Sequence, residues 1–223
     1  MYTLYWSADT GAFAVQAVLE EAGLPYRREV VDTGQGQHRA PEYLAVNPMA
    51  QVPAMRLPDG TVITESGAMV LHLCDACPES GLLPAPGTAA RAVAYRWLFW
   101  LATGLYEADL RYYYPGRYTS EPSGADGVKA AALERMDRLA AMADDLLRTG
   151  PYALGERFSA VDVYLLMLVL WHPARAALFA RHARVGELAR LVRRRPAIER
   201  IWTQHYPPGG DSAWSTWTGS SAP

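Results

Sequence analysis

The chain of 223 residues contains only two cysteines, so it does not carry the disulfide framework typical of small secreted domains. Its most apolar stretch, residues 161–171, is short of the roughly 18 residues that cross a bilayer and is interrupted by Asp162 and Tyr164. The N-terminus lacks a basic segment followed by an apolar run, so secretion is not indicated. We therefore expect a cytoplasmic protein with no membrane partner.

Neither sign of charge is in excess, since Lys and Arg number 21 and Asp and Glu number 23. No overall field attracts nucleic acid, and we expect no nucleic-acid partner. The basic cluster at Arg193, Arg194 and Arg195 has no aromatic residues interleaved for base stacking, so we interpret it as a solvated helix face. The length permits one large domain or two modest ones, each with its own core.

Strand and helix patterns alternate at the start of the chain. Residues 3–6 and 26–31 are rich in strand formers, and the helical spacing of 12–22 between them stops at Gly23. This order predicts a β-α-β unit with a parallel pair of strands.

The pattern continues with a short helix, a hairpin and a longer helix. A helix is predicted at 41–44, where Pro occupies a tolerated first-turn position. Strands are predicted at 54–57 and 61–64, joined by the turn residues 58–60, and helical spacing resumes over 66–76. The order β-α-β-α-β-β-α predicts a thioredoxin-like fold.

Everything beyond a Pro- and Gly-rich linker has helical spacing. We predict a thioredoxin-like domain over 1–78, a linker over 79–87, an all-α domain over 88–206 and a C-terminal tail over 207–223. Trp214 and Trp217 suggest that part of this tail packs against the rest of the chain.

Two patterns stand out in the predicted helical domain. Ser159 and Asp162 form a capping box with Asp in place of Glu, which opens a nearly all-apolar helix that should be central. One face of an earlier helix is marked by Met136, Leu139, Ala143 and Leu146.

Several short motifs give the chain a more specific resemblance. Residues 47–54 read Asn-Pro-Met-Ala-Gln-Val-Pro-Ala, followed at fixed spacing by 59–60 (Asp-Gly) and 64–66 (Thr-Glu-Ser). With residues 19–26 and 158–163, they closely resemble the glutathione transferases in order and spacing across most of the chain. The resemblance implies a thioredoxin-like N-terminal domain, an all-helical C-terminal domain and a homodimer.

The same resemblance implies a reaction. Members of this family transfer alkyl or aryl groups to glutathione by attack of its thiolate on small hydrophobic electrophiles, a detoxification chemistry. Glutathione is then a co-substrate, a small electrophile is the second partner, and no metal is required.

The implied glutathione site lies in the thioredoxin-like part. A residue before proline is kept out of helical geometry, and free main-chain groups on an extended residue can pair with a bound peptide. The family pattern implies that Val52 does this, next to a cis bond to Pro53, with Gln51 as a further polar contact. A helix N-terminus binds carboxylates and an adjacent acid binds ammonium, which predicts that Glu65 and Ser66 hold the γ-glutamyl end.

Two parts of the implied site stay open. His38 matches a histidine that some classes direct at the glycine end of glutathione, with Arg39 as the alternative. For the group that holds the thiolate, Thr10 falls at the serine position of serine-type classes, and Ser7 and Tyr5 are the alternatives. Thr10 can equally be only a helix cap.

Gly11 stands where one bacterial class has its cysteine, which excludes that class's thiol chemistry. The Cys-x-x-Cys pair at Cys74 and Cys77 is expected at a helix C-terminus, where thiolate is disfavoured, and we interpret both as structural.

The electrophile pocket is implied to lie on the aromatic-rich helix after the linker. Tyrosine offers an apolar face with one hydroxyl, which suits Tyr106 and Tyr113 for substrate contact.

Two other functions stay open beside the transferase. The departures at Thr10 and Gly11 fit a non-catalytic binding or scaffold protein of the same fold. A glutathione-dependent isomerase or ether-cleaving enzyme is the third, although the isomerase branch usually carries Ser-Ser-Cys at this helix start, where residues 9–11 here read Asp-Thr-Gly.

Overall fold

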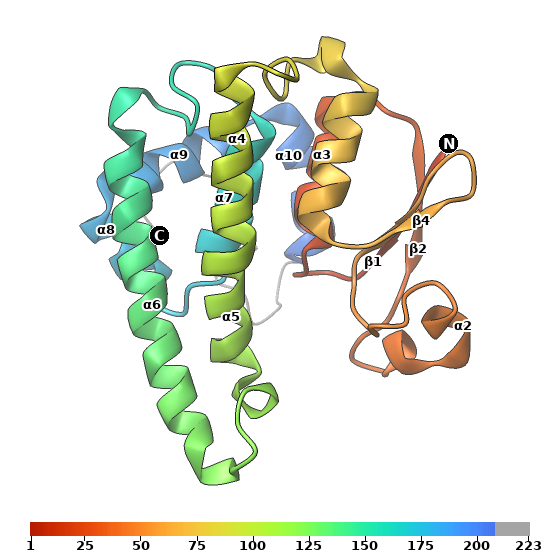
Figure 1. Cartoon of the computed structure of the whole chain (residues 1–223), viewed down its shortest axis with the longest axis vertical. Coiled ribbons are helices and arrows are strands. Elements are labelled where there is room, and N and C mark those ends of the chain that lie inside the picture. Colours follow the sequence, from red (N-terminus) through yellow and green to blue (C-terminus); the bar gives the residue numbers. More distant parts are fainter. Residues whose placement is uncertain (208–223) are drawn as a thin grey trace. The chain divides into compact units, whose positions relative to one another are not determined.

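The computed structural model describes residues 1–207; the predicted tail, apart from its first residue, lies outside them, as do Trp214 and Trp217. The chain divides into two compact units (Figure 1). Met1–Leu83 and the described chain from Arg193 onward form the N-terminal unit, and Pro84–Val192 form the helical unit. The predicted thioredoxin-like fold followed by an all-α fold is confirmed.

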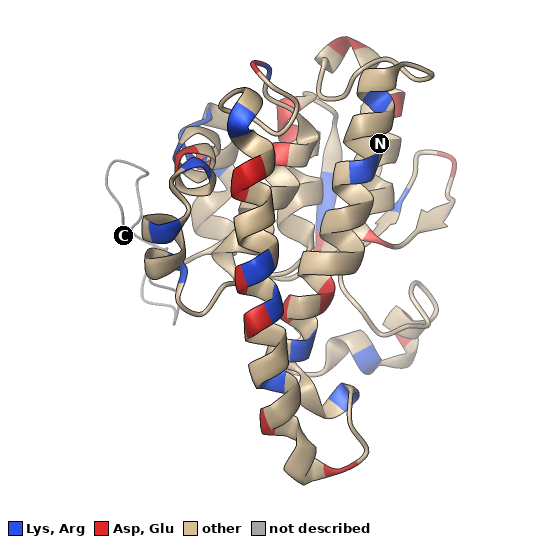
Figure 2. Ribbon diagram, turned by 60° about the vertical axis from the view of Figure 1, so that its left-hand side comes forward, with Lys and Arg blue, Asp and Glu red and all other residues tan. Residues whose placement is uncertain are grey.

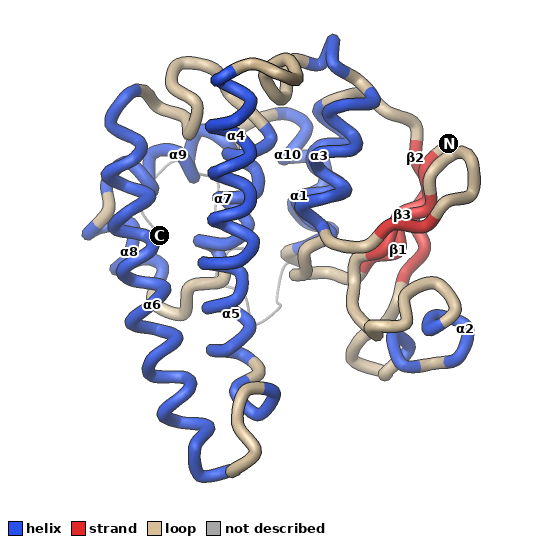
Figure 3. The backbone as a smooth tube through the Cα atoms, in the orientation of Figure 1, coloured by secondary structure: helices blue, strands red, loops and turns tan. Residues whose placement is uncertain are grey.

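A four-stranded mixed sheet forms the centre of the N-terminal unit, in the order β2-β1-β3-β4 (Figure 3). Its strands are β1 (Tyr2–Trp6), β2 (Tyr26–Val30), β3 (Ala54–Arg56) and β4 (Val62–Ile63). Strands β1 and β2 are parallel, as the β-α-β pattern predicts, and β3 runs antiparallel to both β1 and β4.

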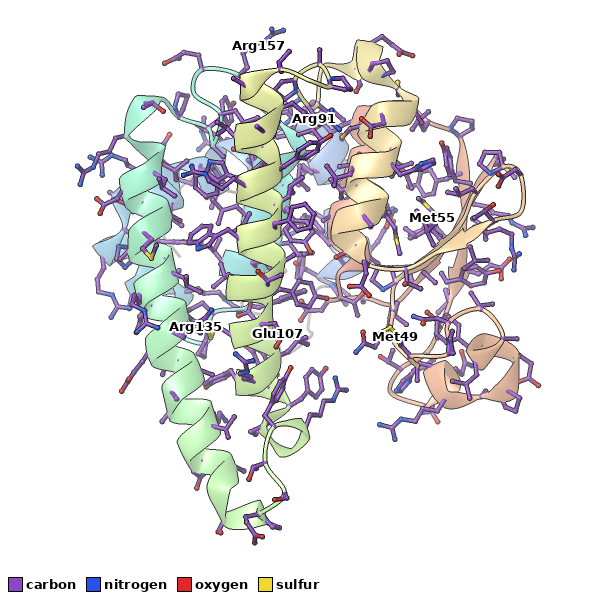
Figure 4. The ribbon with its side chains drawn as sticks, viewed as in Figure 1. Met49, Met55, Arg91, Glu107, Arg135 and Arg157 are labelled. Carbon is purple, nitrogen blue, oxygen red and sulfur yellow. The ribbon has the colours of Figure 1, made fainter. Side chains whose placement is uncertain are left out.

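Each face of this sheet has its own core. The helices are α1 (Ala12–Glu21), α2 (Pro41–Leu44) and α3 (Ser66–Ala76), with the 3-10 turns η1 (Gln37–Arg39) and η2 (Pro78–Ser80). Leu4 and Met55, partners in the sheet, are fully buried on the face that carries α1 and α3 (Figure 4). Their neighbours Tyr5 and Ala54 point to the other face and pack with Tyr43 of α2.

The last helix, α10 (Pro196–His205), packs against α1 within the N-terminal unit. Arg195 pairs with Glu21 through two bonds of 2.6 and 2.7 Å, and Arg200 pairs with Glu20 at 3.0 Å. Below these ion pairs lie aromatic contacts between the two helices, made by Phe13, Trp202, His205 and Tyr206. The bulky apolar face of α10 therefore supplies part of the N-terminal unit's core.

A buried polar network also joins α1 to α10. His205 is 1% exposed, and its Nε2 lies 2.7 Å from the Oε1 of Gln16. Burial, with the charge of Arg28 acting in the same direction, lowers the pKa of His205 to about 3 from 6.5. The ionisable groups bonded into this network are Tyr26 and Glu20, with Arg28 bonded to Gln204 and Arg200 paired with Glu20.

This lowered pKa predicts a pH-dependent contribution to stability. The unfolded chain binds the His205 proton near pH 6.5 and the native state only near 3, so the contribution is complete above 6.5 and is lost as pH falls. We expect His205→Phe to have a lower free energy of unfolding than the unchanged protein at neutral pH. This difference should shrink by up to about 1.4 kcal/mol for each pH unit below 6.5. Urea unfolding at several pH values measures it, and the other titrating groups cancel in the difference. Parallel pH profiles would contradict the prediction.

The helical unit is built around one fully buried helix. Its helices are α4 (Ala89–Trp100), α5 (Tyr106–Tyr113), α6 (Ala125–Leu146), α7 (Ala160–Leu170), α8 (Arg175–Arg181) and α9 (Ala183–Arg193), the last of which ends at the unit boundary. A π-helical turn, Leu101–Leu105, joins α4 to α5, and 3-10 turns lie at Pro115–Arg117, Pro122–Gly124 and Leu147–Thr149. Every residue of α7 is buried, and its predicted capping box is confirmed.

The predicted face of α6 needs one correction. Met136, Leu139 and Ala143 are buried, but Leu146 is 36% exposed, and Leu147 is the buried residue instead. The helix ends at Leu146 and a 3-10 turn follows, so the spacing of 3.6 residues no longer applies there.

Basic side chains of the C-terminal part are paired with acids. Arg181 bonds Asp137, and Arg184 contacts Asp144 at 2.9 Å. Figure 2 shows acidic and basic residues interspersed along α6. None of the helices in the described part of the chain is long and apolar enough to span a membrane.

Candidate active site

The sheet brings the β1 end, the segment before β3 and the end of β4 to one edge. Tyr5 pairs with Ala54, the first residue of β3, so the end of β1 and the segment that contains Val52 and Pro53 lie at the same edge of the sheet. The loop that follows β1 and the loop that precedes β3 therefore meet at this edge.

The β3–β4 register adds the last predicted element to this edge. Met55 pairs with Ile63, the last residue of β4, so the segment that leads to Glu65 leaves the sheet at the same edge. The hairpin therefore explains how residues twelve positions apart in the sequence reach one site.

The peptide bond between Val52 and Pro53 is cis, which confirms the prediction. The segment before it is fixed by two bonds to the carbonyl of Gln51, from the hydroxyl of Tyr43 at 2.6 Å and the Nδ2 of Asn47 at 2.8 Å. The Oδ1 of Asn47 also accepts from the N–H of Met49 at 3.0 Å. Asn47 is 1% exposed and thus serves as the hub of this loop.

Val52 itself is left available for a ligand. Within residues 1–207, no hydrogen bond engages its main-chain N–H or C=O. Its side chain is partly buried against the Tyr5–Tyr43 cluster, which holds the residue in place. Gln51, whose carbonyl is already used, has an exposed side chain. The arrangement offers a bound peptide both groups of one extended residue.

Glu65 and Ser66 lie where α3 begins. Glu65 is exposed and has a φ of 63°, a left-handed conformation that costs a residue with a side chain of order 1–3 kcal/mol. Ser66, 7% exposed, is the first residue of the helix. Such outliers persist where the surroundings enforce them, often at ligand sites.

Thr10 lies in the loop between β1 and α1. Its hydroxyl donates to the carbonyl of Ser7 at 2.8 Å and accepts from the N–H of Ala12 at 3.3 Å. Thr10 is half-buried and directly precedes Gly11, the N-cap residue of α1. A sulfur atom would therefore have to replace the carbonyl of Ser7 as the acceptor of this hydroxyl proton.

The two alternative hydroxyls differ in their surroundings. Ser7 lies 3.3 Å, oxygen to oxygen, from the hydroxyl of Thr33, in the loop after β2. Tyr5 is 8% exposed, and its hydroxyl accepts from Arg56 at 3.3 Å on the sheet face that carries α2.

The remaining predicted residues of the N-terminal unit are placed as follows. His38, half-buried, lies on η1 in the connection from β2 to α2. Cys74 and Cys77 are buried at the C-terminal end of α3, where burial and the nearby Glu79 raise the pKa of Cys77. No group of three or more possible metal ligands occurs among the described residues.

In the helical unit, Tyr106 and Tyr113 share one anchor. The ring of Tyr106 meets the ring of Trp171 edge to face at 5.2 Å, and the hydroxyl of Tyr113 donates to the carbonyl of Trp171. The two tyrosines are seven residues apart and so lie on one side of α5. The π-helical turn comes directly before Tyr106, and such turns are frequent at functional sites.

Sequence reasoning missed the residues that support the site. Tyr43 and Asn47 fix the segment before the cis bond, and Trp171 anchors both tyrosines. A signal for Asn47 was present, because an asparagine next to a proline commonly bonds the backbone of its own turn. Nothing local in the sequence marks Trp171.

Comparison with known proteins points to one family. A family model described as "Glutathione S-transferase, N-terminal domain" matches residues 12–76. A crystal structure of a glutathione transferase homologue from Sulfitobacter, with bound glutathione, is 32% identical, covers 92% of this chain and 98% of its own, and superposes with a TM-score of 0.85.

Curated relatives include an enzyme and a regulator. Glutathione S-transferase GstA of Escherichia coli O157:H7 is 26% identical over 169 residues, which are 75% of this chain and 81% of that protein. Transcriptional regulator URE2 of Saccharomyces cerevisiae is 35% identical over 173 residues, 69% of this chain but only 49% of the yeast protein. The fold, the cis bond of Val52 to Pro53 and these matches agree, and the chain belongs to the glutathione S-transferase family.

Proposed function

We propose that this protein is an enzyme that joins glutathione to small hydrophobic electrophiles through the glutathione sulfur. One observation carries the proposal furthest: the free main-chain groups of Val52, before a cis proline, lie on the same sheet edge as the start of α3. The Sulfitobacter homologue, which resembles this chain over nearly its whole length, holds glutathione.

Each end of glutathione has a matching group in the N-terminal unit. Val52 pairs with the cysteinyl main chain, as a strand would. Ser66 and the start of α3 bind the γ-glutamyl carboxylate, and Glu65 binds its ammonium group. Gln51 adds a polar contact, and His38 reaches the glycine end.

The reaction needs the thiolate, because a thiol with a pKa near 8.5 is only a few per cent ionised at neutral pH. Thr10 donates its hydroxyl proton to the sulfur, with Ser7 or Tyr5 as the alternative donors. The sulfur lone pair then forms a bond to carbon. In a substitution the leaving group departs with its bonding pair, and in an addition the substrate takes up a proton.

The electrophile contacts Tyr106 and Tyr113, whose common anchor on Trp171 holds two aromatic rings on one side of α5. We also propose a role in detoxification, a cytoplasmic location and a twofold dimer, because the chain belongs to the same family as glutathione transferases such as GstA. The domain boundaries predicted from the sequence remain a prediction.

Glutathione affinity tests the site directly. Glu65→Gln and Ser66→Ala should each weaken binding by about 1–3 kcal/mol, the range for hydrogen bonds to charged groups. Titration calorimetry measures the loss, and Glu29→Gln, a change at a half-buried acid on β2 that pairs with Arg27, is the matched control. Two variants that bind as tightly as the control would refute the assignment of α3.

A binding or scaffold protein is the second candidate, because a transcriptional regulator is among the relatives, although the match covers only about half of that protein and does not favour this candidate over the enzyme. Retention on immobilised glutathione followed by an aryl-halide conjugation assay separates the two. Retention with turnover supports the enzyme, and retention with no turnover on a panel of electrophiles supports the carrier.

A further inference from the structure

The loop Ser7–Gly11, which carries Thr10, is short and contains a strained residue. Hydrogen bonds join Thr10 to Ser7, Ala12 and Phe13. Asp9 has a φ of 51°, a left-handed conformation that a residue with a side chain adopts at a cost. A loop of this kind keeps one conformation only when the structure around both its ends is rigid.

His205 contacts the residues on both sides of this loop. The ring of Trp6, the last residue of β1, meets the imidazole at 5.1 Å and 64°. The ring of Phe13, in the first turn of α1, meets it at 5.3 Å and 88°. Both contacts are edge to face, the arrangement that aromatic pairs prefer. One side chain of α10 thus packs against the last residue before the loop and a residue just after it.

Hydrogen bonds fix the orientation of this imidazole. The hydroxyl of Tyr26 donates to the carboxylate of Glu20 at 2.6 Å, so it accepts from the Nε2 of Gln16 at 3.0 Å. The same amide nitrogen donates to the Oε1 of Gln204 at 2.9 Å. The Oε1 of Gln16 is therefore an acceptor, and the Nε2 of His205 carries the proton donated to it at 2.7 Å.

Trp6 is held from a second direction as well. The guanidinium of Arg28 on β2 lies over the Trp6 ring, 4.7 Å from its centroid, and also bonds Gln204 of α10. The residue before the loop is thus fixed through β2 and α10 together, by a network that reaches none of the loop's own hydroxyls.

We propose that His205 is a positioning residue for glutathione activation: by packing between Trp6 and Phe13, it fixes the loop Ser7–Gly11 and so the direction of the hydroxyl that meets the sulfur. The inference rests on the proposed function for its chemical consequence. It makes α10 a determinant of thiol activation through His205, a side chain that is itself buried.

The test is the titration of bound glutathione, followed by thiolate absorbance. His205→Leu removes the ring and should shift the thiol titration by about one pH unit, a tenfold loss of thiolate at low pH, with glutathione affinity within about twofold. His205→Phe retains the ring and should recover most of the shift. Ile198→Ala, at a buried residue about 10 Å away along α10, is the matched control for lost stability.

The titrations of these variants can overturn the positioning role of His205. A titration of His205→Leu that matches the unchanged protein overturns the inference, and so does an equal shift in Ile198→Ala. If His205→Leu does not fold, Gln16→Met, which removes the acceptor of the imidazole proton, takes its place and should shift the titration in the same direction. An unshifted Gln16→Met then overturns the inference.

Amide hydrogen exchange separates this inference from the proposed function. If the unchanged protein shows no glutathione thiolate, the proposed function fails. The positioning role is then tested by the hydrogen-exchange rates of the backbone amides of residues 8–12. Faster exchange there in His205→Leu than in Ile198→Ala supports positioning, and equal exchange refutes it.

Discussion

Asp162→Ala should lower the free energy of unfolding of the helical unit by about 3–5 kcal/mol. The carboxylate of Asp162 is fully buried and accepts three hydrogen bonds, from the N–H of Ala153 at 2.6 Å and from the N–H and hydroxyl of Ser159 at 2.7 and 2.8 Å. An alanine leaves two buried N–H groups without an acceptor, and each costs about 1–3 kcal/mol.

The same carboxylate does more than cap α7. Its bond to Ala153 ties the chain before the helix to the helix's first turn, so the loop and the cap are lost together. Burial raises the pKa of Asp162 to about 6, although the three donors act to lower it. Its place at the start of the fully buried α7 makes it a polar position at which substitution should be costly.

Urea unfolding of matched variants measures the effect. Asp162→Asn should fall between alanine and the unchanged protein, because one of its two acceptors becomes an amide N–H₂. Asp145→Ala is the control: its side chain is 65% exposed and pairs only with Arg148, so its loss should be below about 1 kcal/mol. A loss in Asp162→Ala no larger than that of the control would show that the capping box is dispensable.

The parts of the structure that the sequence predicted depend on local signals. The strand-helix order and the capping box are encoded in local patterns, whereas the cis bond at Pro53 was implied by the resemblance to the glutathione transferases. Motifs of this kind act through backbone geometry or through a side chain that bonds its own turn, so short-range pattern suffices to find them.

The parts that the sequence did not predict depend on long-range packing. The sequence predicts that the chain beyond the linker is helical but not which helices pack together, and only the structure shows that α10 packs on α1 and brings His205 to Trp6. The π-helical turn before Tyr106 has no periodicity of its own in five residues. Trp171 likewise gains its role from Tyr106 and Tyr113, more than fifty residues earlier.

Thr10→Val should raise the pKa of the glutathione thiol and cut turnover at low pH by about tenfold, with glutathione affinity nearly unchanged. A hydrogen bond to a charged acceptor contributes about 1.5–3 kcal/mol, whereas the bond to the Ser7 carbonyl that it replaces contributes about 0.5–1.5. The net gain of about 1–1.5 kcal/mol corresponds to about one pKa unit. The bond from the N–H of Ala12 can remain, since the hydroxyl accepts it through a lone pair.

The conservative variant Thr10→Ser, together with variants of Ser7 and Tyr5, decides which hydroxyl holds the thiolate. Thr10→Ser retains the hydroxyl and should keep thiolate absorbance and turnover, while Thr61→Val, at an exposed hairpin residue, controls for the loss of a hydroxyl as such. Thiolate absorbance that survives in Thr10→Val but disappears in Ser7→Ala would transfer the role to Ser7, which lies in the same loop. Loss only in Tyr5→Phe would place it on the buried tyrosine, whose hydroxyl would first have to leave Arg56. If all three variants keep the thiolate, no hydroxyl at this helix start activates the sulfur, and the main-chain N–H groups of α1 are left to hold the charge.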